Sequence, residues 1–190
     1  NFTSACIVAK LVKEIDSKIT VVIGGPHPSM VGSEVLKCPE VDLAVMGEGE
    51  ATIVELLNTI ESGKSFDSIK GLIYKKDDLI IQNPPREFMD NLDALAFPYT
   101  AAKETLKDFA LYPKAAFGYI LSTRGCPYNC FFCGSRNIWS RRVRFRAPKN
   151  VVEEIKGLQN EGVRLFHFVD DNFGVNKEYI RDLCTVLIKH

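Results

Sequence analysis

Hydrophobic positions in the first part of the chain alternate between helical and strand spacing. Apolar residues three or four apart predict a helix over residues 4–17 and another around Ile53–Ile60 that stops near Gly63; a short helix is also expected over residues 29–37. The apolar runs at residues 19–23 and 41–46 predict buried strands, each followed by a glycine-rich turn. This alternation predicts a parallel sheet with crossover helices, whose strand-end turns are where open α/β sheets bind ligands.

The first part of the chain ends with a predicted hairpin over residues 71–82, and a proline-containing linker over residues 84–116 leads to the second part. A strand at residues 119–122, a helix capped by Asn150 with Glu153 three residues on, a strand at residues 163–169 and a final helix through residues 180–188 follow. We therefore divide the chain into an α/β region at residues 1–83, a linker at 84–116 and a second α/β region at 117–190.

Composition narrows the class of protein. The 190 residues are 46% hydrophobic and 25% charged, which is typical of a soluble globular protein and excludes a wholly disordered chain. No apolar run reaches the ~18 residues that span a bilayer. The 24 basic and 24 acidic residues cancel, so a nucleic-acid partner is not expected. The chain starts at Asn1 and stops at His190 inside an apolar periodic segment, so we expect a piece of a longer protein.

The six cysteines fall into two groups. Cys126, Cys130 and Cys133 lie within eight residues, whereas Cys6, Cys38 and Cys184 are scattered through apolar segments and are interpreted as ordinary buried thiols. The absence of a signal peptide at the present N-terminus and the ample apolar content favour a reducing, cytoplasmic location over a disulfide framework. Three thiolates on a loop after a strand indicate zinc or an iron–sulfur cluster, and three ligands would leave one iron open for chemistry.

The segment from Cys126 to Cys133 resembles the radical S-adenosylmethionine (SAM) superfamily, whose hallmark is CxxxCxΦC with an aromatic residue before the last cysteine; Phe132 fills that place. The resemblance implies that the three cysteines hold a [4Fe–4S] cluster, that the open iron chelates SAM, and that Phe132 lies beside the adenine. It also implies a βα barrel and an electron donor such as flavodoxin or ferredoxin. Structural zinc or free thiols are the alternative.

Two further features follow the motif. In the family the end of the second barrel strand often contacts the SAM amino group, so Asp170 or Asp171 could do so here; a helix-entry turn with solvated acids is the alternative. His167 is interpreted as a packed strand residue rather than a ligand. The basic stretch contacts either an anionic substrate or the SAM carboxylate, or it is a solvated loop; it comprises Arg136, Arg141, Arg142, Arg144, Arg146 and Lys149.

The glycine turns of the first region resemble those of the cobalamin-binding domain that precedes the barrel in the B12-binding class of this superfamily. The sequences GGPHPS and GEGE carry this resemblance, and Leu92–Pro98 is similar to the class's interdomain linker. The resemblance implies the C-terminal part of a Rossmann-like domain followed by the first βα units of a partial barrel. The implied cobalamin contacts are Gly24, Gly25, Gly47, Glu48 and Gly49. No cobalt-ligating role is assigned to His27.

The function implied by the resemblance is reductive cleavage of SAM to a 5′-deoxyadenosyl radical, with cobalamin-dependent methyl transfer to an unactivated carbon, oxidative cyclisation or rearrangement. The substrate, a small molecule or a peptide, is not identified by the sequence. Two alternatives stay open: a non-catalytic zinc-binding interaction module, and a radical SAM enzyme that does not bind cobalamin.

Overall fold

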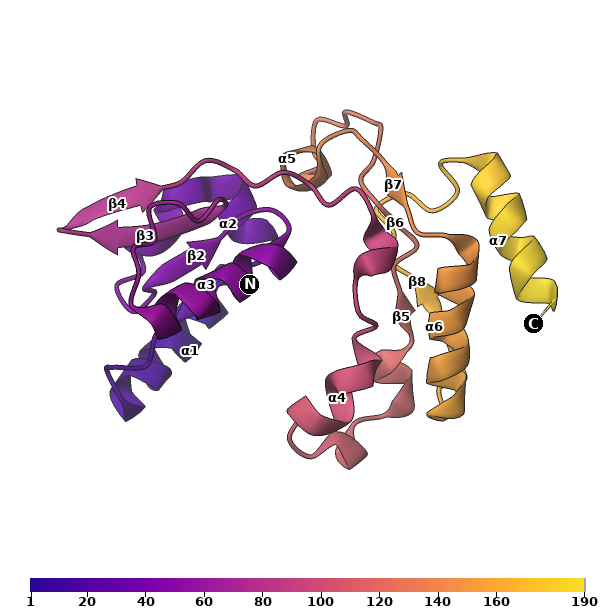
Figure 1. The fold of residues 1–190 in the computed structure, drawn as a ribbon, viewed down its shortest axis with the longest axis horizontal. Helices are drawn as coiled ribbons and strands as arrows, with labels where there is room; N and C mark the ends of the chain where they lie inside the picture. The colour runs from indigo at the N-terminus through magenta and orange to yellow at the C-terminus, as the bar shows by residue number, and fades with distance from the viewer. Residues whose placement is uncertain (190) are drawn as a thin grey trace. The chain divides into compact units, whose positions relative to one another are not determined.

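The structure is a computed structural model that describes residues 1–189. The chain forms two compact units, which divide between Met89 and Asp90, and each is described by itself (Figure 1). Both units combine helices with strands, as the sequence predicts. Within residues 1–189, no helix is both long enough and apolar enough to cross a membrane.

The first unit contains a four-stranded mixed sheet with the strand order β1-β2-β3-β4. Strand β1 (Val22–Ile23) runs parallel to β2 (Leu43–Val45), and β3 (Leu72–Lys76) is antiparallel to both β2 and β4 (Leu79–Gln82). The predicted parallel pair is therefore present, and the predicted hairpin extends the same sheet. Asp77 and Asp78 make its two-residue turn with φ values of 49° and 64°, the conformation that matches the twist of hairpin strands.

Helices cover both faces of this sheet. Helix α1 (Phe2–Ile15), the short helix α2 (Pro26–Val31) and the 3₁₀ segment η1 (Gly32–Lys37) pack on the face that carries Ala44 and Ile73. Helix α3 (Gly49–Ser62) packs through Leu56 on the opposite face, which carries Leu43 and Leu72. Successive side chains of a strand point to opposite faces, so the same short strands supply two separate cores.

The helix ends follow local chemistry. Asn1 caps α1, because its side-chain oxygen accepts a hydrogen bond from the Ser4 amide at 3.0 Å. Gly63 ends α3 in the left-handed conformation at φ 63°, as its position in the sequence predicts. The single helix predicted over residues 29–37 is instead α2 followed by η1, and Gly32 at φ 59° marks the break between them.

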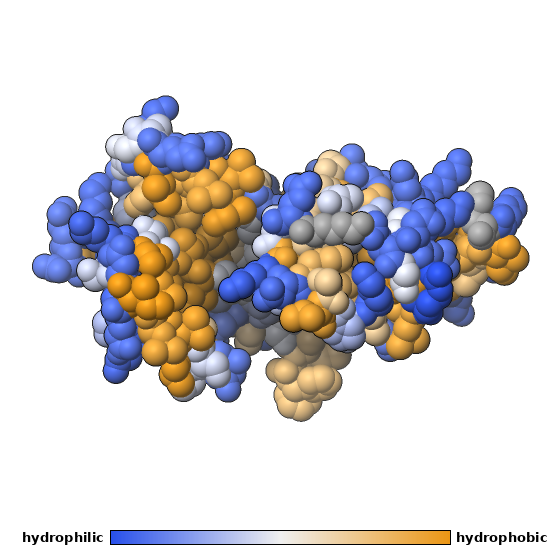
Figure 2. Space-filling view, turned by 90° about the horizontal axis from the view of Figure 1, so that it is seen from below, coloured by the Kyte–Doolittle hydropathy of each residue, from blue (hydrophilic) through white to orange (hydrophobic). Residues whose placement is uncertain are grey.

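The outer surfaces of α1 and α3 are apolar. Ile7, Leu11 and Ile15 on α1 are exposed, as are Val54 and Leu57 on α3. Figure 2 shows apolar side chains gathered over this part of the chain. Of the apolar positions whose spacing predicts these helices, Ala9 and Leu56 are buried, whereas Ile15, Ile53 and Leu57 are exposed. The spacing therefore locates the two helices but not their buried faces.

The second unit begins with short helical segments: η2 (Leu92–Ala94), α4 (Tyr99–Thr105), η3 (Phe109–Leu111) and η4 (Lys114–Phe117). Strand β5 (Tyr119–Ile120) pairs in parallel with β8 (His167–Phe168), while β6 (Thr123–Arg124) and β7 (Arg144–Phe145) form an antiparallel pair. The remaining helices are α5 (Ser135–Trp139), α6 (Pro148–Asn160) and α7 (Lys177–Lys189). The order of β5, α6, β8 and α7 gives the predicted βα units (Figure 1).

The core of the second unit lies between the parallel strands and helices α6 and α7. Ile120, Val151 and Leu183 are fully or almost fully buried within it. The strands approach closely at Gly118, where a Cβ atom would overlap the Leu165 carbonyl oxygen. Gly118 also accepts a hydrogen bond from the His167 amide at 2.8 Å, so a residue without a side chain is needed there.

Two expectations for this unit are wrong. Asn150 does not cap α6: the helix begins at Pro148, whose fixed φ suits the first turn, and the Asp93 carboxylate accepts the Ala147 amide at 2.9 and 3.2 Å. Asn150 therefore lies inside the helix. Cys184 is exposed rather than buried, because α7 packs through Leu183, one position away around the helix.

Candidate cofactor and metal sites

The two glycine turns of the first unit lie side by side. Ile23 at the end of β1 is the register partner of Ala44 in β2, so the turns after these parallel strands leave the same edge of the sheet. The hydroxyl of Ser29 joins them: Gly47 N–H donates to Ser29 Oγ at 2.8 Å, and Ser29 Oγ–H donates to the Gly25 carbonyl oxygen at 3.1 Å. The turns therefore form one connected backbone surface.

This surface fits the approach of a large ligand. Gly25 and Gly47 have φ values of 94° and 68°, which other residues rarely adopt. A Cβ atom built at Gly24, Gly25 or Gly47 would meet nothing within 4 Å, so the bare backbone faces open space. Gly49 is the first residue of α3, and a Cβ there would make ordinary contact with Val45.

Two polar side chains near these turns, those of Glu48 and His27, already contact other residues of the first unit. Glu48 is only 7% exposed, and its Oε2 accepts the Met89 amide at 2.7 Å. His27 stacks against the ring of Phe2 with 4.3 Å between ring centroids. The cobalamin contacts assigned by resemblance stay predictions, and the geometry favours the glycine backbone over the Glu48 carboxylate as the approachable part of this set.

The cysteine triplet lies on the long loop between β6 and β7. The two strands pair at Thr123–Phe145 and Arg124–Arg144, so they close the loop at its base. Gly125 begins the loop at φ 102°, and a Cβ atom there would overlap the Arg142 carbonyl oxygen. Glycine directly before Cys126 is therefore required both by backbone conformation and by the close approach of the returning chain.

All six cysteines are free thiols, and those of the triplet are accessible. Cys126 is half-buried, Cys130 and Cys133 are exposed, and the Cys133 amide donates to the Cys130 carbonyl oxygen at 3.1 Å in a tight turn. Among residues 1–189, no three cysteine, histidine or acidic side chains are already gathered in a metal-binding arrangement. The donor set nevertheless fits an iron–sulfur cluster, because three soft thiols share one short, closed loop.

The other cysteines have a different environment. Burial raises the pKa of the Cys38 thiol to about 11, with a further contribution from its hydrogen bond with Cys6. A thiol with so high a pKa stays protonated at neutral pH and is a poor metal ligand. Cys38 is buried, as predicted for an ordinary thiol.

Two exposed aromatic residues lie between the second and third cysteines of the triplet. Phe132 is 79% exposed and Phe131 is 93% exposed, and their rings meet edge to face with 5.4 Å between centroids. Burying such rings against a ligand would be favourable, since each carries a large apolar area. This environment suits the adenine contact predicted for Phe132, which stays a prediction.

The two aspartates after β8 occupy different environments. Asp170 is directed inward: its Oδ1 accepts hydrogen bonds from the backbone amides and hydroxyls of Ser122 and Thr123. Asp171 is exposed. Of the pair, Asp171 is the carboxylate that faces solvent, whereas Asp170 is engaged with the loop base. His167 is exposed and stacks on Tyr119 of the neighbouring strand at 5.6 Å.

The basic stretch does not form one uniform surface. The Arg146 side chain is 11% exposed; its guanidinium pairs with Glu154 at 2.6 Å, donates to the Leu121 carbonyl oxygen at 2.9 Å and lies over the Phe97 ring. Arg144 is also buried, at 4% exposure. Arg142 pairs with Asp90 at 2.8 Å. Arg142, Arg144 and Arg146 are thus paired with acids or buried within the fold. Fewer basic side chains are therefore available to bind an anionic substrate than the sequence indicates.

Several residues that shape the sites have no local sequence signal. Ser29 acts through a contact with Gly47, 18 residues along the chain, and Ser122 and Thr123 act through contacts with Asp170, 48 and 47 residues along it. The glycine before the cysteine motif was visible in the sequence, but its close approach to Arg142 depends on where the loop returns.

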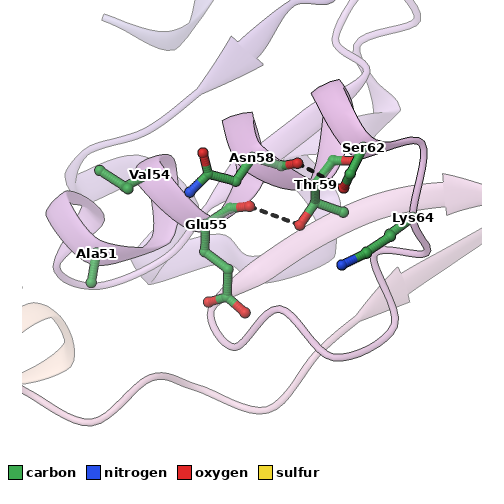
Figure 3. A pocket seen from close by; sticks show the side chains of 7 residues that line it. All are labelled: Ala51, Val54, Glu55, Asn58, Thr59, Ser62 and Lys64. Atoms are coloured by element: carbon green, nitrogen blue, oxygen red, sulfur yellow. Dashed lines mark hydrogen bonds between the residues drawn. The ribbon is translucent and has the colours of Figure 1, made fainter.

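Two hollows of the surface lie away from these residues. Figure 3 shows one of about 470 Å³ along α3, where the hydroxyls of Thr59 and Ser62 donate to carbonyl oxygens of the same helix. The carboxylate of Glu55 in this hollow pairs with Arg86. A second hollow of about 300 Å³ lies between α4, η4 and α6. Neither contains a residue predicted to bind a cofactor.

Comparison with family models gives a match in each unit. The B12 binding domain matches residues 1–57, and the radical SAM superfamily matches residues 120–190. The first match contains both glycine turns, and the second contains the cysteine triplet and both aspartates. The two regions predicted from motifs are thus recovered independently of the structure.

Curated relatives align along nearly the whole chain. An uncharacterized methyltransferase of Pyrococcus horikoshii is 34% identical over 188 residues, which is 94% of this chain and 39% of the relative. An anaerobic magnesium-protoporphyrin IX monomethyl ester cyclase of Synechocystis is 31% identical over 185 residues, covering 96% of this chain and 36% of the relative. The chain thus spans less than half the length of these relatives.

Solved structures show the same fold. TsrM of Kitasatospora setae, a radical SAM methyltransferase with cobalamin and a [4Fe–4S] cluster bound, superposes with a TM-score of 0.74 at 21% identity, over 97% of this chain and 37% of that chain. OxsB, a cobalamin-dependent SAM radical enzyme, superposes with a TM-score of 0.71 at 18% identity, over 97% of this chain and 26% of that chain.

Proposed function

Since the chain belongs to the cobalamin-binding class of the radical SAM superfamily, we propose that its triplet Cys126, Cys130 and Cys133 holds a [4Fe–4S] cluster at which SAM is reductively cleaved. The observation that carries the proposal is the closed loop between β6 and β7, which holds three free thiols within the region matched by the radical SAM model. When bound, the cluster supplies one electron to the S–C5′ bond of SAM, giving methionine and a 5′-deoxyadenosyl radical.

The residues of the chain would bind and orient these groups. The thiolates provide three ligands and leave one iron for SAM. Phe132 would cover the adenine with its exposed ring, and Asp171 would accept hydrogen bonds from the SAM ammonium group through its exposed carboxylate. The electron would come from a protein donor of the flavodoxin or ferredoxin kind. The six free thiols fit a reducing cytoplasm.

We propose cobalamin as the second cofactor, held against the glycine turns after β1 and β2. The open space above Gly24, Gly25 and Gly47 supports this assignment, as does the match of the B12 binding domain over these residues. Cobalamin would supply a cobalt centre that carries a methyl group. The named relatives include a methyltransferase and a cyclase, so we propose methyl transfer to an unactivated carbon or oxidative cyclisation as the outcome.

The cluster is tested by anaerobic reconstitution of the full-length protein with iron and sulfide. We expect about four iron atoms per chain, a broad absorption band that bleaches on reduction, and an EPR signal of the reduced cluster that changes when SAM is added. Production of 5′-deoxyadenosine should require the reductant. A single tightly bound zinc, with no iron uptake, would instead identify a zinc-binding interaction module.

Cobalamin is tested separately. Protein produced in the presence of cobalamin should retain a corrinoid absorption spectrum after gel filtration. A protein that forms 5′-deoxyadenosine but neither retains nor takes up a corrinoid would be a radical SAM enzyme that works without cobalamin. Product analysis by mass spectrometry then separates methyl transfer, a gain of one CH₂ unit, from oxidative cyclisation, a loss of hydrogen.

A further inference from the structure

The cysteine loop is reached through Ser122, in the connection between β5 and β6, and Thr123, the first residue of β6. These two residues are 0% and 3% exposed. Both of their backbone amides and both of their hydroxyl groups need hydrogen-bond acceptors. Asp170 supplies them from a distant part of the sequence.

The parallel pairing of β5 with β8 puts Asp170 in this position. Tyr119 is the register partner of His167 and Ile120 that of Phe168, and the Val169 amide donates to the Ile120 carbonyl oxygen at 2.9 Å. Asp170 is the next residue along the chain. Its carboxylate therefore lies next to Ser122 and Thr123, just beyond the ends of β5 and β8.

Four donors converge on one oxygen of Asp170. Ser122 donates through its amide at 3.0 Å and its hydroxyl at 2.9 Å; Thr123 donates through its hydroxyl at 2.7 Å and also through its amide. Hydrogen bonds to an ionised acceptor are stronger than those to a neutral one. The second oxygen, Oδ2, is buried without a hydrogen-bond partner in the described structure.

The same connection is held from a second direction. Arg146 donates to the Leu121 carbonyl oxygen, and its own amide donates to the Ser122 carbonyl oxygen at 2.9 Å. The Tyr179 hydroxyl donates to the Ser122 carbonyl oxygen at 3.3 Å. The amides thus bond to Asp170 and the carbonyls to Arg146 and Tyr179. This segment has little freedom, in contrast to the exposed loop that follows it.

We propose that Asp170 is a positioning residue that fixes the first cysteine of the cluster loop through Ser122 and Thr123. The inference rests on the proposed cluster. Cys126 follows Thr123 by three residues, so their Cα atoms are at most about 11 Å apart. The intervening Gly125 is held against the Arg142 carbonyl oxygen. A shift of Thr123 is therefore transmitted to Cys126 along a short path with restricted backbone freedom.

This role separates the two neighbouring aspartates. Asp170 positions the cysteine loop whether or not SAM is bound, whereas the exposed Asp171 is available to contact SAM. The difference is measurable: loss of the Asp170 charge changes the cluster in the absence of SAM, and loss of the Asp171 charge changes only SAM binding.

The test compares Asp170→Asn with Asp182→Asn, which makes the same chemical change at an exposed carboxylate of α7. In reconstituted full-length protein, we expect Asp170→Asn to alter the EPR line shape of the reduced, SAM-free cluster. Its midpoint potential should move to a more positive value, since removing a negative charge favours the reduced state. Asp182→Asn should match the unaltered protein in both. Unchanged line shape and potential in Asp170→Asn would overturn the proposal.

A second variant covers the case in which Asp170→Asn does not fold. Thr123→Val keeps the shape of the side chain but removes one of the four donors, so we expect a smaller change in line shape. A Thr123→Val cluster identical to that of the unaltered protein would then count against the proposal.

Hydrogen exchange in the cluster-free chain separates this proposal from the proposed function. Asp170→Asn should raise the exchange rate of the amides of residues 122–126 about tenfold, and Asp182→Asn should leave it unchanged. If the unaltered protein binds no cluster, the proposed function fails, and this measurement still decides whether Asp170 fixes the loop base. Equal exchange in both variants would show that it does not.

Discussion

The two candidate sites differ in how much of each is built by the fold. In the first unit, the glycine turns are short, follow paired strands directly and are joined by the Ser29 hydroxyl. In the second unit, the cysteine loop is long and closed at its base by β6 and β7, and Cys130, Phe132 and Cys133 on it are exposed. The comparison teaches that a sheet edge can form a backbone surface in advance, whereas the three thiols of an exposed loop are not gathered by the fold alone.

The buried polar groups follow the same division. The first unit uses one hydroxyl to connect its turns, but the second commits a carboxyl group, that of Asp170, and a guanidinium group, that of Arg146, to the loop base. Such groups are costly to bury and strongly directional when satisfied. We interpret them as the rigid support that an otherwise exposed loop requires. The following predictions challenge this comparison, from the largest effect to the smallest.

Replacing one cysteine of the triplet should have the largest effect. Cys130→Ala removes one of three cluster ligands, so we expect iron uptake after anaerobic reconstitution to fall to background. Cys184→Ala is the matched control, since Cys184 is exposed but lies on α7 outside the loop; it should retain full iron content. Equal loss of iron in both variants would show that the ligand assignment is wrong.

Arg146→Ala should cause the largest loss of folding stability. It leaves the Glu154 carboxylate buried at 5% exposure without its cationic partner, a change that typically costs about 3 to 5 kcal/mol. Urea unfolding followed by the fluorescence of Trp139, the one tryptophan among these 190 residues, reports on this unit. Arg141→Ala, at an exposed position, should leave the midpoint unchanged. Matching midpoints in the two variants would contradict our view of the loop base.

Gly125→Ala tests whether the start of the cysteine loop needs glycine. The residue has φ 102°, and the new methyl group would overlap the Arg142 carbonyl oxygen, so we expect a loss of about 1 to 3 kcal/mol. The control is Gly24→Ala, where a Cβ atom meets open space. Urea midpoints measured by circular dichroism should separate the two. A Gly125→Ala protein as stable as Gly24→Ala would mean that the loop start adjusts freely.

Ser29→Ala should have a smaller effect on the first unit. It removes the hydroxyl that accepts from Gly47 and donates to Gly25, which should cost about 1 kcal/mol. Retention of cobalamin on gel filtration should weaken in parallel. Ser17→Ala removes an exposed hydroxyl in the same unit and should change neither quantity. Undiminished stability in Ser29→Ala would show that the two turns are independent.

The smallest effect concerns pH. The hydrogen bond to Asp67 raises the pKa of Tyr74 to about 12, above the value near 10 expected in the unfolded chain. The folded state therefore keeps a proton that the unfolded state loses, and this contribution to stability declines as pH rises from 10 to 12. Tyr74→Phe should show a shallower decline of the urea midpoint over that interval. Parallel curves would contradict the assignment.

The sequence predicted the elements whose signals are local. Apolar spacing located α1, α3, α6 and α7, the position of Gly63 located the end of α3, and the Asp77–Asp78 turn located the hairpin. The triplet and the glycine turns were identified because their residues are adjacent in sequence. Helix α4 within the predicted linker was not anticipated, since residues 84–116 carry four prolines and irregular apolar spacing.

What the sequence did not predict depends on contacts between distant residues. Asn150 looked like a cap because it precedes Glu153, yet the Asp93 carboxylate and Pro148 start the helix earlier. Arg146 looked like a free charge within a basic stretch until Glu154, eight residues later, brought it inward. Asp170 and Asp171 are chemically identical neighbours, and only the register of β5 with β8 distinguishes them.

The two-sided sheet of the first unit also determines which changes in chain length this region tolerates. Strand β2 contributes Ala44 to one core and Leu43 and Val45 to the other. A single-residue deletion within this strand would turn these side chains to the wrong faces and disrupt both cores together. A deletion or insertion at Lys64 or Ser65 would disturb the cores less, because both residues are exposed and precede Phe66, which packs against the second core. Natural variation in length within this domain should therefore collect between α3 and β3 and avoid β2.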